Sequence, residues 1–157
     1  MIENIVVNGR SSKSKSTFQM SYAVGTNIRS KPSQIWALLT HAKDFPNWNS
    51  TVKNIDGKIA LGEKIQLRAT IAPKRIFKLK VSEFVPEQKM VWRDGVAPMF
   101  QGVRTYVLKA KNDGSTDFLM EEIFSGLMLP MIVKSLPDFG PTFEQYAADL
   151  KRAAEKI

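Results

Sequence analysis

The sequence contains no cysteine and only one histidine, His41, among its 157 residues. Without cysteine, disulfide scaffolds, cysteine nucleophiles and thiolate metal clusters are excluded. A single imidazole cannot form a metal site that needs two of them. The Gly-rich motifs that cradle nucleotide phosphates are also absent. We therefore expect no metal and no cofactor.

Long apolar runs are missing as well. The longest, Leu127 to Val133, contains Pro130 and is too short to span a bilayer. The N-terminus lacks the apolar stretch and cleavage pattern of a signal peptide, so the expected location is the cytoplasm. With 43% hydrophobic and 24% charged residues, a chain of 157 residues is typical of one soluble globular domain.

The charge balance is basic, with 23 Lys and Arg against 15 Asp and Glu, a net charge of +8. Such an excess favours polyanionic partners. The basic residues are scattered, however, and no run reaches the five or six consecutive like charges of a binding tail. We therefore expect no nucleic-acid partner. A basic outer face at Arg68, Lys78 and Lys80 leaves peripheral contact with an anionic membrane as an alternative.

The N-terminal segment has few core-forming residues. Residues 9–16 are polar and Ser/Lys-rich, which predicts a loop or disordered arm. The β-prone piece at residues 5–7 leaves an edge strand open. We therefore divide the chain into an arm at residues 1–16, flexible or an edge strand, and one domain at residues 17–157.

Hydrophobic periodicity indicates an α+β fold. A period of two predicts a strand over residues 18–28, and prolines then open two short helices near Pro32 and Pro46. Alternating segments follow and predict an antiparallel sheet with one buried face. Apolar spacing of three and four residues predicts a long helix from about Pro141 to the C-terminus. The expected order is strand, two short helices, about six strands and a long helix.

The strands over residues 103–110 and 116–124 are joined by a turn-forming sequence around Asp113 and Gly114. A turn centred near Asp113 makes three pairs face each other: Arg104 with Glu122, Tyr106 with Met120, and Leu108 with Phe118. The apolar members turn this face inward, so Arg104 and Glu122 are expected to form an inward ion pair. A register slip of one residue would turn Glu121 inward instead.

This ion pair has two interpretations. It is either a structural pair or the polar end of a ligand pocket. In the second case Arg104 orients a ligand carbonyl or carboxylate, and Glu122 acts as a general acid or base. The catalytic residues are therefore unknown, with Glu122 and Arg104 as candidates.

The order of elements and several motifs resemble the SRPBCC superfamily, which has the helix-grip or START-like fold. The resemblance covers about residues 18 to 157 and departs from the family at His41, where an acidic residue is common. The motifs that carry it are Pro32-x-x-Ile35-Trp36-x-Leu38-Leu39-Thr40, Phe45-Pro46-x-Trp48-Asn49, Gly57, Gly62, Met90-x-Trp92, Thr116-x-Phe118 and Glu122-x-Phe124-Ser125-Gly126.

The resemblance implies a curved antiparallel sheet of about seven strands around a long C-terminal helix, with two short helices after the first strand. It also implies a mostly apolar cavity that binds a hydrophobic or amphipathic small molecule, lipid- or polyketide-like. The expected ligand-binding residues are Trp48, Leu67, Phe77, Leu79, Trp92, Arg104, Tyr106, Phe118, Met120, Glu122, Phe124 and Phe143.

Two other functions stay open at this point. One is a cyclase- or dehydratase-type enzyme that uses Glu122 as general acid or base. We favour a binding protein over such an enzyme. The other is a module that binds a partner or a membrane through its basic surface. The sequence does not determine the oligomeric state.

Overall fold

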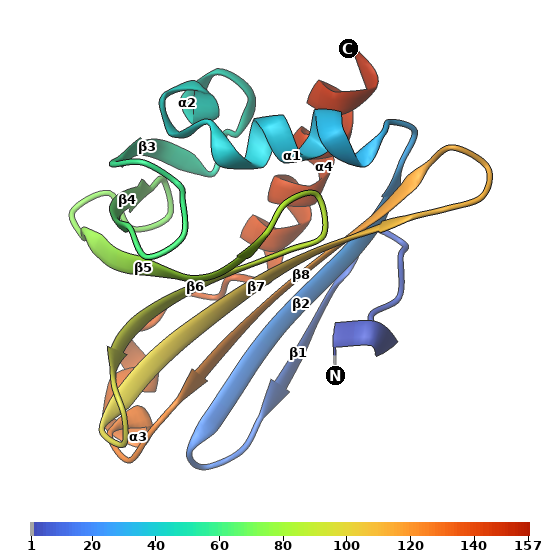
Figure 1. Cartoon of the computed structure of the whole chain (residues 1–157). Helices are drawn as coiled ribbons and strands as arrows, with labels where there is room; N and C mark the ends of the chain where they lie inside the picture. Colours follow the sequence, from blue (N-terminus) through green and yellow to red (C-terminus); the bar gives the residue numbers. More distant parts are fainter. Residues whose placement is uncertain (1) are drawn as a thin grey trace.

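The computed structural model describes residues 2–157, which form an antiparallel sheet curved around a long C-terminal helix (Figure 1). The sheet has eight strands in the order β1-β2-β8-β7-β6-β5-β4-β3. Their bounds are β1 Ser11–Lys15, β2 Gln19–Ile28, β3 Val52–Asp56, β4 Lys64–Ala69, β5 Phe77–Val85, β6 Lys89–Val96, β7 Phe100–Ala110 and β8 Thr116–Ser125.

Residues 2–157 also form four α-helices and three 3-10 turns. The α-helices are α1 Pro32–Thr40, α2 Phe45–Trp48, α3 Leu129–Ile132 and α4 Gly140–Glu155, and the 3-10 turns are η1 Ile2–Asn4, η2 Ala42–Asp44 and η3 Val133–Ser135. Each α-helix has proline in its first turn, where the missing N–H leaves no helical bond unmade. The α+β class and the helix-grip arrangement are confirmed, as are the two short helices and six strands between the strand at residues 18–28 and the last helix.

The sheet has one strand more than the seven expected, and this additional strand is β1. Ser11–Lys15 pairs with β2 in a register that runs from Ser11 opposite Val24 to Lys15 opposite Met20. The structure thus corrects the loop predicted over residues 9–16, and it places no strand at residues 5–7. Hydrophobic periodicity does not reveal this strand, because an edge strand is held by backbone hydrogen bonds and can be polar on both faces. The division into residues 1–16 and 17–157 stays a prediction.

The hydrophobic core lies between the concave side of the sheet and α4. Phe143, Tyr146, Ala147 and Leu150 of α4 are almost completely buried there, and each large side chain contributes roughly 1.5–3 kcal/mol by leaving water. The small helices α1 and α2 cover the end of this core near the C-terminus of α4 (Figure 1). Within residues 2–157, none of the helices has the length and apolar character that a membrane crossing requires.

Candidate functional site

The β7–β8 hairpin has the register that its turn predicts. Arg104 lies opposite Glu122, Tyr106 opposite Met120, and Leu108 opposite Phe118. Glu121 pairs with Thr105, so it belongs to the opposite face of the sheet. The alternative register with Glu121 inward is therefore excluded. The side chains of Arg104 and Glu122 are 16% and 12% exposed, which makes them an inward ion pair.

A cavity of about 50 Å³ lies between the sheet and the N-terminal half of α4. Most of its wall is apolar, and charged groups gather at one end. Its lining residues are Thr51, Val52, Leu67, Ala69, Ile71, Phe77, Leu79, Asp94, Arg104, Glu122, Phe124, Phe139, Thr142, Phe143 and Tyr146. Part of this lining is only half-buried, so the cavity is open to solvent there. The half-buried lining residues are Ile71, Phe77, Leu79, Thr142 and, at the polar end, Asp94, Arg104 and Glu122.

Arg104 and Glu122 form the centre of the polar end. The guanidinium Nε and Nη2 atoms both lie 2.8 Å from the same carboxylate oxygen, Glu122 Oε1. The guanidinium carbon also lies 5.1 Å from the centre of the Phe143 ring, an arrangement that favours a cation. Arg104 is therefore held by a carboxylate on β8 and by an aromatic ring on α4.

Asp94 adds a second carboxylate that the sequence analysis missed. It lies opposite Gly102, whose backbone N–H donates to Asp94 Oδ1 at 2.9 Å. A Cβ atom on Gly102 would lie 2.6 Å from Asp94 Oδ1 and 3.5 Å from Glu122 Oε2. Glycine at this position thus lets two carboxylates flank the same point. The available signal was the inward alternation Met90, Trp92, Asp94 along β6.

Burial decides the protonation of these groups. It raises the pKa of Glu122, and Arg104 offsets only part of this effect. Burial likewise raises the pKa of Asp94, opposed by the Gly102 N–H and by the charges of Arg75 and Arg104. For Arg104, burial opposes the charge, but Glu122, Tyr106 and Tyr146 together outweigh it and raise the guanidinium pKa. The polar end therefore combines a permanent cation with two carboxyl groups that ionise less readily than usual.

Two buried tyrosines, Tyr106 and Tyr146, lie near Arg104. The Tyr146 hydroxyl donates to the Tyr106 hydroxyl at 3.3 Å, and burial raises the pKa of both. Only Tyr146 lines the cavity. Both phenols therefore stay neutral at physiological pH, as polar groups inside an apolar wall.

The structure brings seven of the twelve predicted ligand-binding residues to the cavity. They are Leu67, Phe77, Leu79, Arg104, Glu122, Phe124 and Phe143. The other five, Trp48, Trp92, Tyr106, Phe118 and Met120, are buried but are not part of its lining.

Aromatic packing explains why four of these five residues, all except Met120, do not line the cavity. The Trp92 and Tyr106 rings meet edge to face with centroids 5.0 Å apart, and Phe118 stacks on Tyr146 at 6.3 Å. Trp48 meets Tyr146 edge to face at 6.0 Å. These rings fill the space between the sheet and the middle of α4. The cavity remains only beyond them, toward the N-terminal end of the helix.

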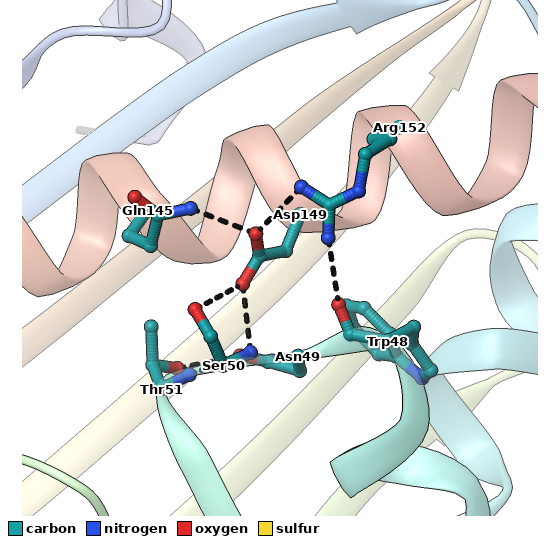
Figure 2. Close-up of polar contacts among 7 residues, drawn as sticks. All are labelled: Trp48, Asn49, Ser50, Thr51, Gln145, Asp149 and Arg152. Carbon is teal, nitrogen blue, oxygen red and sulfur yellow. Dashed lines mark hydrogen bonds and ion pairs between the residues drawn. The ribbon is translucent and has the colours of Figure 1, made fainter.

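A buried carboxylate on α4 positions one wall of the cavity (Figure 2). Asp149 Oδ2 accepts hydrogen bonds from the Ser50 N–H and hydroxyl, both at 2.7 Å. Its Oδ1 accepts from Gln145 at 2.8 Å and from Arg152 at 3.0 Å. Burial opposes the ionisation of Asp149, but these donors outweigh it and lower its pKa. The loop after α2, which carries the lining residue Thr51, is thereby fixed to the helix.

Comparison with known proteins finds similar folds among solved structures alone. No family model matches the sequence, and no curated protein matches it. A START superfamily protein from Mycobacterium smegmatis superposes with a TM-score of 0.65 at 14% identity, over 87% of this chain and 97% of that one. A protein from Mesorhizobium loti gives a TM-score of 0.68 at 19% identity, over 87% and 98% of the two chains.

A conserved protein of unknown function from Enterococcus faecalis is also similar. It gives a TM-score of 0.63 at 14% identity, over 94% of this chain and 82% of that one. At such identities the likeness concerns the fold, and the fold hosts many functions. On the evidence of its sheet order, its C-terminal helix against the concave face and these neighbours, the chain has a START-like helix-grip fold.

Proposed function

We propose that this protein binds a hydrophobic or amphipathic small molecule in the cavity between the sheet and α4. The observation that carries the proposal is the composition of the cavity, which has apolar walls and one polar end at Arg104, Glu122 and Asp94. Ligand sites typically combine such walls with a few convergent polar groups. Burial of apolar surface supplies affinity, and the polar end orients the ligand.

The size of the cavity adds a requirement. Its 50 Å³ is well below the roughly 150 Å³ of a cavity that holds benzene. A lipid- or polyketide-like molecule therefore enters only if a wall moves. The half-buried residues Ile71, Phe77 and Leu79 belong to the β4–β5 hairpin. We expect this hairpin to move away from α4 when ligand binds.

Blocking the opening tests this proposal. Thr142 lies in the first turn of α4 and lines the cavity, whereas Ala148 on the same helix is exposed and does not. We expect Thr142→Trp to weaken binding of the neutral dye Nile red at least tenfold, measured by fluorescence titration. The matched variant Ala148→Trp should bind like the wild type. Equal binding by both variants would place the dye elsewhere and contradict the proposal.

Acid–base catalysis is a second candidate, favoured by the position of Glu122. This residue faces the cavity, and burial raises its pKa, as a general acid requires. A cyclase or dehydratase acting on a polyketide-like substrate would lose turnover in Glu122→Gln while still binding Nile red. Unchanged turnover in this variant would exclude the role.

A third candidate uses the outer face of β4 and β5. Lys64 lies directly opposite Lys80, and Arg68 and Lys78 share this exposed face. Opposed like charges destabilise a strand pair, and an anionic membrane surface would relieve that repulsion. Co-sedimentation with phosphatidylserine vesicles should then disappear at raised salt. Association that is insensitive to salt would contradict this role.

A further inference from the structure

The charges around the cavity restrict the chemistry of its ligand. We infer that the polar end selects a ligand whose polar group donates hydrogen bonds, an amine or a hydroxyl, and disfavours a carboxylate. The inference rests on the proposed function and concerns the same cavity. It also revises the expectation that Arg104 orients a ligand carbonyl or carboxylate.

The first step is the number of unused acceptors. The Gly102 N–H uses Asp94 Oδ1, and both guanidinium bonds use Glu122 Oε1. Within residues 2–157, neither Asp94 Oδ2 nor Glu122 Oε2 receives a hydrogen bond from another residue. Two carboxylate oxygens at the cavity are therefore available to a donor. A donor on the ligand would give these two half-buried acceptors a hydrogen-bond partner.

The second step is the balance of charge. Among residues 2–157, Arg104 is the single basic residue that lines the cavity, and Glu122 already neutralises it. Asp94 then leaves the polar end with an excess of negative charge whenever both carboxyls are ionised. Arg75 is the other cation that acts on Asp94. It is exposed and its guanidinium lies over the Phe77 ring at 4.9 Å, outside the cavity lining.

The third step concerns a ligand carboxylate. Placed near Asp94, it would be repelled by the one negative charge that Arg104 does not neutralise, and such repulsion is stronger in a half-buried site than in water. An ammonium group would instead form charge-assisted hydrogen bonds to the same oxygens. The molecule as a whole carries a net charge of +8 and attracts anions. A preference for amines therefore has to arise locally, at the polar end.

Three probes with the same six-carbon chain test the inference: hexylamine, 1-hexanol and hexanoate. Their binding is followed at pH 7 by the NMR amide shifts of the cavity residues Phe77, Leu79 and Thr142. We expect hexylamine to bind at least tenfold more tightly than hexanoate, with 1-hexanol between them. Asp94→Asn preserves the acceptor for the Gly102 N–H. It should weaken hexylamine at least fivefold and change 1-hexanol by less than twofold.

A control variant and the opposite outcomes complete the test. Asp56→Asn removes an exposed carboxylate on β3 and should leave all three affinities unchanged. Hexanoate binding as tightly as hexylamine, or hexylamine binding unaffected by Asp94→Asn, would overturn the inference and leave the proposed function intact. If none of the probes shifts the cavity signals, the proposed function fails and the inference with it.

Discussion

At the scale of single residues, the ion pair between Arg104 and Glu122 is the place where one substitution should change the free energy of unfolding most. Both side chains are largely removed from water and share two close contacts of 2.8 Å to one carboxylate oxygen. A buried pair contributes little net stability compared with apolar residues of the same size, but each member depends strongly on the other. The pair therefore places charge at the cavity and adds little to the net stability of the fold.

Removing the cation alone should be costly. We expect Arg104→Met to lower the free energy of unfolding by roughly 3–5 kcal/mol at pH 7, because Glu122 is left buried without a partner. The double variant Arg104→Met/Glu122→Leu removes both charges and should lose less than Arg104→Met alone. Urea unfolding of the wild type, both single variants and the double variant gives the coupling energy. A double variant at least as unstable as Arg104→Met would contradict this view.

The pH dependence of this loss has a definite sign. Burial already raises the pKa of Glu122 in the wild type, and loss of Arg104 raises it further. A carboxyl with a raised pKa in the folded state is ionised first in the unfolded chain, whose glutamates titrate near pH ~4.3. Its destabilising effect is absent below that pH and grows as the pH rises through the folded pKa. The Arg104→Met deficit should therefore be smaller at pH 4 than at pH 7.

At the scale of elements, contacts distant in sequence hold the ends of the sheet in place. β1 is joined to α4 through the Ser11 N–H, which donates to Glu144 at 2.8 Å. The loop after α2 is joined to the same helix through Asp149 (Figure 2). Helix α4 thus organises two segments that have little apolar surface of their own.

The Asp149 contacts lead to the second prediction. We expect Asp149→Ala to lower the free energy of unfolding by about 2–3 kcal/mol at pH 7, because the Ser50 N–H loses a charged acceptor in a buried site. Asp56→Ala, at an exposed carboxylate on β3, should change stability by less than about 0.5 kcal/mol. Urea unfolding measures both.

Acid should reduce the difference in free energy of unfolding between the wild type and Asp149→Ala. The donors around Asp149 lower its pKa despite burial. Its stabilising effect is present above the unfolded value of about 3.9 and disappears as the pH falls through the folded pKa. The gap between wild type and Asp149→Ala should therefore narrow at pH 3. A gap that stays constant with pH would show that packing, rather than charge, is lost.

Local patterns allowed part of this architecture to be predicted. The turn at Asp113 determines the β7–β8 register, and with it the pairing of Arg104 with Glu122. Alternation identified the inward face, but it carries no information on how far along the helix a side chain lies. For that reason Trp92 and Phe118 were assigned to the cavity although they fill the core. Strand β1 was missed because polar edge strands have no hydrophobic period.

At the scale of the whole molecule, the cavity is space that the core leaves unfilled. The aromatic side chains around Tyr106 and Tyr146 pack closely, and the gap lies between β4, β5 and the start of α4, which all contribute to its lining. Unfilled apolar space lowers stability, because its walls lose contacts that a filled core would make. Proteins commonly keep such a defect where activity needs it.

Filling the gap provides the third prediction. Ala69 ends β4 and lines the cavity, so the two added carbons of Ala69→Val would be buried there. At roughly 0.8 kcal/mol per buried methylene, less the strain of fitting the side chain, we expect a gain of about 1 kcal/mol in urea unfolding. The same substitution should weaken Nile red binding, because the added carbons occupy the space of the ligand.

The matched variant is Ala110→Val, at the exposed end of β7. It changes strand propensity without filling any space, so its gain should be smaller and its binding unchanged. If Ala69→Val is more stable and binds less, the gap is retained for a ligand at the expense of stability. A destabilised Ala69→Val would instead mean that the cavity walls do not yield even to one larger side chain. A lipid-sized ligand would then have no way in, and the small gap would be a packing defect without a function.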